Sequence, residues 1–241
     1  LLTRDDIAVI DICTPGDSHA EIAIAALDAG KHVICEKPLA NSVEEAEAMT
    51  AAATRAQARG VAAMVGFNYR RVPAVALARQ LVGVGALGSV RHVRAQYLQD
   101  WIVDPDFPLS WRLQRERAGS GALGDIGAHV IDATQFVLDD LLTGVSGLTE
   151  TFIRDRPGGS VTVDDCALFL GRFSAGAVAT FEATRLATGR KNGLRFEING
   201  SAGSLAFDLE KLNELWYYDQ AEDATTAGFR RILVTEPTHP Y

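Results

Sequence analysis

A lysine, an aspartate and a histidine in this sequence have the types and the spacing of an acid–base site: Lys37, Asp125 and His129. Asp125 and His129 are four residues apart, so on a helix they share one face, whereas Lys37 comes just after the apolar run 33–35. A neutral imidazole can take a proton from an alcohol, an ammonium can stabilise the developing alkoxide, and a carboxylate can orient either partner. The three residues therefore predict chemistry at a hydroxyl group, if the fold brings them together.

The elements that must position Lys37 follow a repeating pattern between residues 7 and 71. Short apolar runs alternate with helical segments, and Ser18 with Glu21 and Ser42 with Glu45 have the capping-box pattern that opens a helix. Parallel neighbours in a sheet require such crossover connections, so the pattern predicts a doubly wound parallel sheet. We expect strands at residues 7–12, 32–35 and 61–65, and helices at 18–30 and 42–60.

The carboxyl ends of these strands are where a doubly wound sheet binds its ligands. The segments at those ends are 13–17, 36–38 and 67–70, and Lys37 lies in the second of them. Pro38 has no N–H group to donate and should end the strand ladder just past the lysine. Lys37 is therefore expected on the rim of a cleft.

After Gly88 the pattern changes to partly alternating strands separated by turns, which predicts a mostly antiparallel sheet. Between the first two of these strands lies the glycine-rich segment 119–129, which continues as an apolar helix to about Leu138. We expect strands at residues 90–98, 145–153, 163–173, 177–185, 194–198, 204–207 and 214–218.

The glycines of the segment around Asp125 and His129 indicate close approach of another backbone or of a flat ligand. If this helix packs across the carboxyl edge of the first sheet, the lysine, the histidine and the carboxylate converge. The glycines concerned are Gly121, Gly124 and Gly127.

Several short motifs, in this order and spacing, resemble the Gfo/Idh/MocA family of NAD(P)-dependent sugar and polyol oxidoreductases. Each motif alone is weak, but together they extend over nearly the whole chain. They are Cys13-Thr14-Pro15 followed by His19, Glu36-Lys37-Pro38, Gly66-Phe67-Asn68-Tyr69-Arg70, Trp111-Arg112, Gly124-Asp125-Ile126-Gly127-Ala128-His129, and the segment 196–204.

The resemblance implies a fold of class α/β. A partial Rossmann domain at residues 1–75 would be followed, at 76–241, by an α+β substrate-binding domain with a large open, mostly antiparallel sheet. It also implies NAD or NADP as cofactor, a sugar-like or polyol-like substrate, and a homo-oligomer, dimer or tetramer, formed through the open sheet.

The resemblance also implies site roles. Lys37, Asp125 and His129 would be catalytic, with His129 as the general acid or base. The cofactor would be bound by Thr14, Pro15, His19, Glu36, Lys37, Pro38 and Asn68, and the substrate by Tyr69, Arg70, Trp111 and Arg112.

Some of these residues have a second interpretation from the sequence. His19 could instead pack on the neighbouring loop, and Trp111 with Arg112 could pack one domain on the other. Asp132, one turn after His129, is expected to be a surface carboxylate. Arg185 is expected on the surface of the sheet, at a subunit interface.

The sequence also departs from the family pattern. The family's glycine-rich phosphate loop, and the residue after it that reads the adenosine ribose, have no counterpart here. We therefore expect the first strands of the Rossmann half and the closing C-terminal helices to be missing, so that the chain is a fragment or the observed part of a longer protein, unable by itself to form a complete cofactor site.

Composition excludes several classes of function. With 23 Lys+Arg against 31 Asp+Glu, the net charge of −8 argues against binding to nucleic acid or to an anionic membrane. Three separate cysteines favour neither a disulfide framework nor a cysteine-rich metal site and fit a reducing cytoplasmic compartment. A metal site formed by Asp125, His129 and Asp132 is not expected either, because a nearby lysine would oppose a cation.

The main hypothesis is hydride transfer between a nicotinamide cofactor and a secondary alcohol of a sugar, polyol or related cyclic compound. Two alternatives stay open at this point. One is a redox-neutral, NAD-dependent lyase or glycosidase of the same family. The other is a non-catalytic binding or assembly module, or a truncated fragment.

Overall fold

Short apolar runs separated by two helices form a small parallel sheet in the first part of the chain. The computed structural model describes residues 1–241, and its first sheet has the strand order β1-β2-β3. Ile12 pairs with Cys35, and Cys35 pairs with Val65, so the carboxyl ends of the strands share one edge, as predicted. The elements are β1 Val9–Ile12, α1 His19–Asp28, β2 His32–Cys35, α2 Val43–Gln57 and β3 Ala63–Val65.

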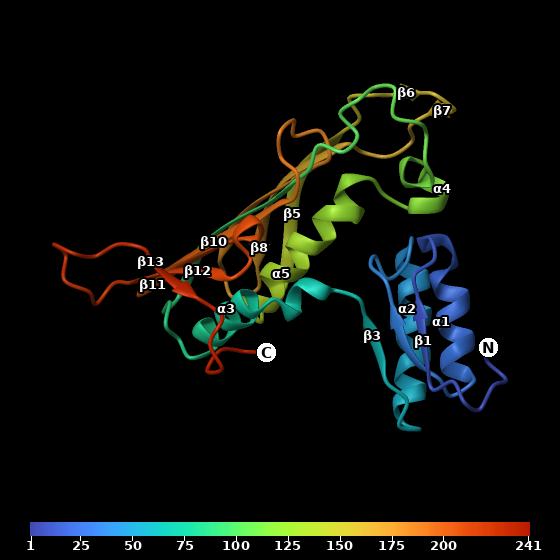
Figure 1. Ribbon diagram of the computed structural model, residues 1–241, viewed down its shortest axis with the longest axis horizontal. Helices are drawn as coiled ribbons and strands as arrows, with labels where there is room; N and C mark the ends of the chain where they lie inside the picture. Colours follow the sequence, from blue (N-terminus) through green and yellow to red (C-terminus); the bar gives the residue numbers. More distant parts are fainter.

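Helices α1 and α2 pack together beside this sheet (Figure 1). Successive right-handed crossovers in the order β1-β2-β3 place both helices on the same face of the sheet. Their buried positions include Ala26 and Ala52, both with no exposed surface, and such small side chains allow close approach. We call this part, residues 1–67, the first body.

The two predicted capping boxes have different outcomes. The Ser42 side chain accepts a hydrogen bond from the backbone N–H of Glu45, as predicted, and the Glu45 carboxylate accepts one from the N–H of Asn41. Ser18 makes no capping bond, so that prediction is wrong. Its hydroxyl donates to Thr14 instead, because a short 3₁₀ turn, Gly16–Ser18, precedes α1 and directs the side chain back into the loop.

An eight-stranded sheet dominates the rest of the chain, which we call the second body, residues 68–241. Its order is β13-β12-β11-β10-β4-β9-β8-β5, and every pair is antiparallel except β4 with β9. The fold class predicted from the sequence is therefore confirmed. The strands are β4 Val90–Leu98, β5 Leu142–Glu150, β8 Cys166–Phe173, β9 Val178–Thr184, β10 Gly193–Gly200, β11 Gly203–Asp208, β12 Glu214–Asp219 and β13 Arg230–Leu233.

Two helices cover one face of this sheet. They are α3 Pro73–Gly83 and α5 Ala128–Leu138, and both run along the sheet in Figure 1. The inward side chains alternate along each strand, and Phe181 and Phe196 are almost fully buried in the core. Burial of each such side chain contributes roughly 1.5–3 kcal/mol. The outward face has no helix over it.

The sequence did not predict the smaller elements. They include β13, at one edge of the sheet, and a hairpin beside the far end of the sheet, formed by β6 Asp155–Arg156 and β7 Gly159–Ser160. The remaining elements are the helix α4 Arg115–Ala118 and the short turns η2 Asn68–Arg71, η3 Trp111–Leu113, η4 Leu123–Gly127 and η5 Leu209–Lys211. No helix is both long and apolar enough to cross a membrane.

The helix that carries Asp125 and His129 begins at an unusual contact. The backbone N–H groups of Gly121 and Leu123 donate to the Asp164 carboxylate at 2.8 and 2.7 Å, and that of Ala122 donates to the Asp164 carbonyl oxygen at 2.9 Å. Asp164 thus satisfies three of the N–H groups that a helix start leaves unpaired. The capping residue comes from a segment more than 40 residues further along the chain.

Gly121 is required by this contact. A Cβ atom at that position would lie 1.8 Å from the Asp164 carbonyl oxygen. The expected close approach of another backbone is therefore confirmed at Gly121. At Gly124 the near neighbour is the side chain of Ser120, and at Gly127 the contacts are ordinary.

Replacing Gly121 with alanine should destabilise the protein by roughly 2–3 kcal/mol, because either the helix start or the Asp164 segment must move. Gly83→Ala is the matched control, since it lies in α3 with open space around it. That change should be neutral or stabilise the protein by about 0.5–1 kcal/mol. Urea unfolding of both variants measures the difference, and equal stabilities would contradict the assigned role of Gly121.

Candidate active site

Lys37 and Asp125 meet where the two bodies touch. The Lys37 ammonium donates to the Asp125 backbone oxygen at 2.8 Å and to its Oδ1 at 3.0 Å, across 88 residues of sequence. Strand β2 ends two residues before Lys37, and Asp125 lies in the π-helical turn η4 that leads into α5. An ammonium has three protons, so one remains for a further acceptor.

The Asp125 carboxylate is held by a second cation. Its Oδ2 lies 3.6 Å from Nη1 of Arg185, a side chain with no exposed surface. Burial opposes ionisation of Asp125, but Lys37, followed by Arg185 and Arg112, outweighs it, so the pKa of the carboxyl group lies below its ordinary value. Asp125 is therefore a fixed negative charge between two positive ones.

His129 lies in the first turn of α5, surrounded by aromatic rings. The Tyr69 ring centroid is 4.7 Å from the imidazole, and those of Tyr97 and Phe67 are 6.0 and 6.2 Å away. Burial, and then the Lys37 charge, lower the pKa of His129 to about 4, while Asp125 opposes this shift. The imidazole is therefore neutral near pH 7 and can accept a proton.

No hydrogen bond joins His129 to Asp125. Nδ1 of His129 is buried and has no hydrogen-bond partner in the structure. The Asp125 oxygens instead face Lys37 and Arg185. The predicted convergence of the three residues thus takes the form of an ion pair beside a separate, neutral base.

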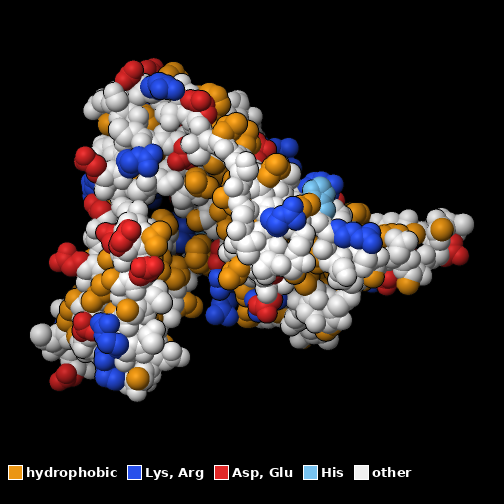
Figure 2. Space-filling model, turned by 180° about the vertical axis from the view of Figure 1, so that it is seen from behind, with side chains coloured by type: hydrophobic (Ala, Val, Ile, Leu, Met, Phe, Trp, Pro, Cys, Tyr) orange, Lys and Arg blue, Asp and Glu red, His pale blue; other side chains and the backbone are white.

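One pocket contains many of the residues predicted to bind cofactor or substrate. Loops that follow β1 and β2 form one side of it, and η3, η4 and the end of β9 form the other. Figure 2, seen from behind, shows a hollow where the two bodies meet. The predicted residues that line the pocket are Thr14, Glu36, Lys37, Pro38, Trp111, Arg112 and Asp125.

His19 makes the loop contacts of its structural interpretation, and its role as a cofactor ligand stays a prediction. It is 1% exposed, and its ring nitrogens lie 3.0 Å from the Pro38 carbonyl oxygen and 2.9 Å from that of Thr14. The ring thus joins the loops that follow β1 and β2. Of the other predicted cofactor ligands, Pro15 precedes the 3₁₀ turn and Asn68 is exposed at the start of η2, and neither lines the pocket.

Asp132 is not a surface carboxylate, and that expectation is corrected. It is 7% exposed and forms an ion pair with Arg70, whose Nε donates to Oδ2 at 2.9 Å. Arg70 also lies over the rings of Phe67 and Phe136, so the pair joins η2 to α5. Helix burial explains the correction, because α5 lies between the sheet and η2. A substrate contact by Arg70 stays a prediction.

The hydroxyl groups beside His129 form a chain. The Tyr69 and Tyr97 hydroxyl oxygens are 2.7 Å apart, and Tyr97 donates to Asn192 at 2.7 Å. Desolvation, and then Tyr69, raise the pKa of Tyr97, which keeps it protonated. Tyr69 was predicted from the sequence, whereas Tyr97 and Asn192 were not.

Trp111 and Arg112 line the pocket from the second body. The Arg112 guanidinium carbon lies 4.4 Å from the centroid of the Trp111 ring. Arg112 is exposed and Trp111 is half-buried. A flat aromatic surface with an exposed cation suits a ring that carries hydroxyl groups.

Arg185 corrects a second expectation, since it is buried in the site instead of lying on the sheet surface. The alternation of side chains along β9 could have predicted that Arg185 is buried. Ala179, Phe181 and Ala183 all point into the core, and Arg185 continues that alternation beyond the strand end. Asp164, like Tyr97 and Asn192, is a site residue that the sequence did not indicate. No cluster of three or more His, Cys, Asp or Glu side chains could hold a metal ion.

Two family models match the chain. One, described as an oxidoreductase family with an NAD-binding Rossmann fold, matches residues 1–67. The other, described as the GFO/IDH/MocA C-terminal domain, matches residues 75–206, which is more than half of the 241 residues.

Curated relatives include a levoglucosan dehydrogenase of Pseudarthrobacter phenanthrenivorans, 46% identical over 259 residues. The alignment covers 100% of this chain and 65% of that protein. A 1,5-anhydro-D-fructose reductase of Ensifer adhaerens is 32% identical over 85% of this chain and 58% of its own length. The chain thus spans less than two thirds of these relatives.

Solved structures agree with the fold. An oxidoreductase domain protein from Kribbella flavida superposes with a TM-score of 0.98 at 67% identity, over 100% of this chain and 65% of that one. A levoglucosan dehydrogenase in complex with NADH and levoglucosan superposes with a TM-score of 0.95 at 48% identity, over 99% of this chain and 64% of that one.

Replacing Lys37 with methionine should raise the pKa of His129, because the lysine ammonium of the unchanged protein opposes protonation of the imidazole. Burial remains, so the pKa should stay below the value of about 6.5 for an exposed histidine. NMR titration of the His129 ring measures the shift. Lys31→Met, at the opposite end of β2, is the control, and an equal titration in both variants would contradict the assigned electrostatics.

Proposed function

The chain belongs to the Gfo/Idh/MocA oxidoreductase family, and on that premise we propose that the full-length protein transfers a hydride between a nicotinamide dinucleotide and a secondary alcohol. The alcohol belongs to a sugar, polyol or related cyclic compound. One observation carries the proposal: a neutral, buried imidazole lies beside a lysine–aspartate ion pair at the carboxyl edge of a parallel sheet.

The substrate class is supported by the relatives and by the pocket. The levoglucosan dehydrogenase and the anhydrofructose reductase both act, by their names, on anhydrosugars. The pocket offers a tryptophan surface, an ammonium and a carboxylate, which suit a ring with several hydroxyl groups. A neutral cyclic sugar, with levoglucosan as the first compound, is therefore the substrate to test.

The hydrogen-bonding groups at the strand ends fit the nicotinamide end of a dinucleotide. The Thr14 hydroxyl, the Glu36 carboxylate and the Lys37 ammonium line one pocket and can bond ribose hydroxyl groups. When bound, the nicotinamide ring supplies the hydride acceptor or donor. Pro38 and the Thr14 loop, held together by His19, would form the surface against which it lies.

The protein's own residues handle the proton. In the oxidation direction, His129 takes the proton from the substrate hydroxyl. The remaining proton of the Lys37 ammonium then bonds the substrate oxygen and stabilises the negative charge that develops on it. Asp125 holds the ammonium in place and can accept a hydrogen bond from a neighbouring hydroxyl group. In the reduction direction the same groups act in reverse.

The open face of the large sheet supports a second copy of the chain as partner. Leu168, Leu170 and Val178 are 39%, 61% and 43% exposed on adjacent strands. An apolar outward row of this kind is unusual for a monomer. We expect light scattering to give a dimer or tetramer, and Leu170→Glu to lower the mass. Val84→Glu, at an apolar residue that follows α3 and is 78% exposed, should leave the mass unchanged.

His129→Ala should lower kcat by about 10²–10⁴-fold, because it removes the proton acceptor. Cofactor affinity, followed by quenching of tryptophan fluorescence with NADH and NADPH, should change little. Equal losses in turnover and in cofactor affinity would contradict the role of His129, and no saturable binding of either dinucleotide to the full-length protein would contradict the proposed function.

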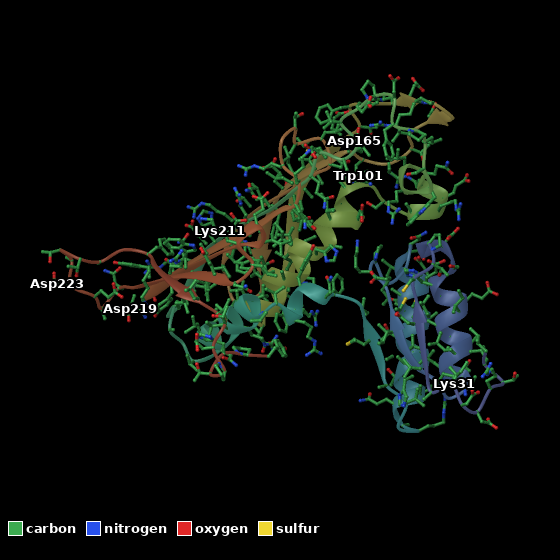
Figure 3. The ribbon with its side chains drawn as sticks, in the orientation of Figure 1. Lys31, Trp101, Asp165, Lys211, Asp219 and Asp223 are labelled. Atoms are coloured by element: carbon green, nitrogen blue, oxygen red, sulfur yellow. The ribbon has the colours of Figure 1, made fainter.

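Lys37→Ala should lower both kcat and cofactor affinity, since the ammonium faces both ligands on the rim. Lys31→Ala is the control. Lys31 lies just before β2, whose other end leads to Lys37, and Figure 3 shows it at the far end of the first body. Steady-state kinetics with levoglucosan should separate the two variants. An unchanged rate for Lys37→Ala would remove this lysine from the site.

A further inference from the structure

Arg185 is a buried cation that the family comparison leaves without a role. Its side chain has no exposed surface, and it follows directly after β9. Nη2 donates to the Asp164 carbonyl oxygen at 3.1 Å, Nη1 donates to the Arg112 carbonyl oxygen at 3.4 Å, and Nη1 lies 3.6 Å from Oδ2 of Asp125. One planar guanidinium thus contacts three separate segments around the pocket.

Each of these segments contributes to the site. Asp164 caps the start of the helix that carries Asp125, and Arg112 lines the pocket. Arg185 therefore fixes the carboxylate, the helix start and the pocket wall relative to one another. A guanidinium can do this because its N–H groups point in fixed directions, whereas an ammonium is a single point of charge.

The contact of Arg185 with Asp125 has a chemical consequence, because two cations share the two oxygens of the carboxylate. Lys37 holds Oδ1 and Arg185 approaches Oδ2, so the carboxylate does not depend on Lys37 alone. Without Arg185, both carboxylate oxygens would be free to draw the ammonium. The lysine would then have fewer protons directed toward a substrate oxygen.

We propose that Arg185 is a positioning residue that holds the Asp125 carboxylate ionised and oriented, so that Lys37 keeps a proton free for the substrate oxygen. This inference rests on the proposed function of the same site. Arg185 lies in the wall of the pocket but has no exposed surface, and its contacts in the structure are with the protein.

The charged groups around Asp125 and Arg185 come from every neighbouring element. Lys37 after β2, Arg112 in η3, His129 in α5 and Tyr97 in β4 influence Asp125 or are influenced by it. Arg185 also faces Asp164 and Asp165, which precede β8. Trp101 lies under the guanidinium, with its ring centroid 5.6 Å from the guanidinium carbon, and Figure 3 shows Trp101 and Asp165 together at this end of the sheet.

Arg156 provides a closely matched control. It is 5% exposed, it donates to the backbone oxygens of Asp104, Ile102 and Phe107, and its Nε, like that of Arg185, has no partner. It also lies over an aromatic ring, that of Phe107. It differs from Arg185 in making no ion pair with an acidic side chain.

Arg185→Gln in the full-length protein should lower kcat by about 10–100-fold with little change in KM for the cofactor. Loss of a cation should also raise the pKa of Asp125. Arg185→Lys should recover part of the rate and most of the change in the Asp125 pKa. Arg156→Gln should leave the pKa of Asp125 unchanged, whatever it does to thermal stability.

A measurement without turnover separates this inference from the proposed function. Carbon-13 NMR titration of the Asp125 carboxyl group should show a higher pKa in Arg185→Gln than in the wild type and in Arg156→Gln. This holds even if no sugar is oxidised. An Asp125 titration identical in all three proteins, or a kcat that Arg185→Gln leaves unchanged, would overturn the inference.

If Arg185→Gln does not fold, Arg185→Lys carries the test. A lysine keeps the charge but cannot reach all three acceptors. We then expect kcat to fall about tenfold or more, with Arg156→Lys close to wild type. Equal rates for Arg185→Lys and the wild type would overturn the positioning role.

Discussion

The contact of Lys37 with Asp125 is the interaction on which the rest of the site depends. It joins a loop of the parallel sheet to the helix that covers the second sheet, and both side chains are mostly buried, at 14% and 26% exposure. A partly buried pair loses much of its hydration, so it is favourable only when its geometry is fixed and its remaining donors and acceptors have partners. The backbone oxygen of Asp125 and the guanidinium of Arg185 supply such partners. The two bodies are therefore held in the one arrangement that completes the pocket.

The start of the helix that carries Asp125 and His129 shows how the sequence meets that requirement. A helix start carries unpaired N–H groups and attracts negative charge, and Asp164 satisfies both needs from a distant segment. Its approach requires a glycine at position 121, and its carbonyl oxygen binds the same Arg185 that approaches Asp125. Turn η4 then continues with π-helical hydrogen bonds before α5 begins, at the place where Asp125 must turn toward the lysine. Such π-turns are often found at functional sites.

Much of this fold could be predicted from local pattern, because strand alternation and crossover helices reflect burial along the chain. Lys37 could be predicted in the same way, since strand ends of a parallel sheet form the ligand edge. Of the corrected residues, Ser18 is diverted by a local 3₁₀ turn, whereas Asp132 and Arg185 depend on packing between distant segments. Asp132 is buried because η2 supplies Arg70, and Arg185 points inward because β9 lies beneath the helix that carries His129. No short stretch of the sequence contains both members of these contacts. The alternation of side chains along β9 could nevertheless have predicted that Arg185 points inward. The domain limits and the individual site roles stay predictions.

One lysine has opposite effects on two neighbours, and this makes the site chemically consistent. Lys37 lowers the pKa of Asp125, which keeps the carboxylate charged, and it also lowers the pKa of His129, which keeps the imidazole neutral. Burial by the aromatic rings acts with Lys37 on the histidine and against it on the aspartate. The aspartate stays ionised because it has more than one cation, whereas the histidine has no hydrogen-bond partner to stabilise a charge. A neutral base and an ammonium held by a carboxylate are the two states that oxidation of an alcohol requires at the outset. In this arrangement His129, a proton acceptor, and Lys37, a proton donor, lie side by side, and each keeps its own protonation state.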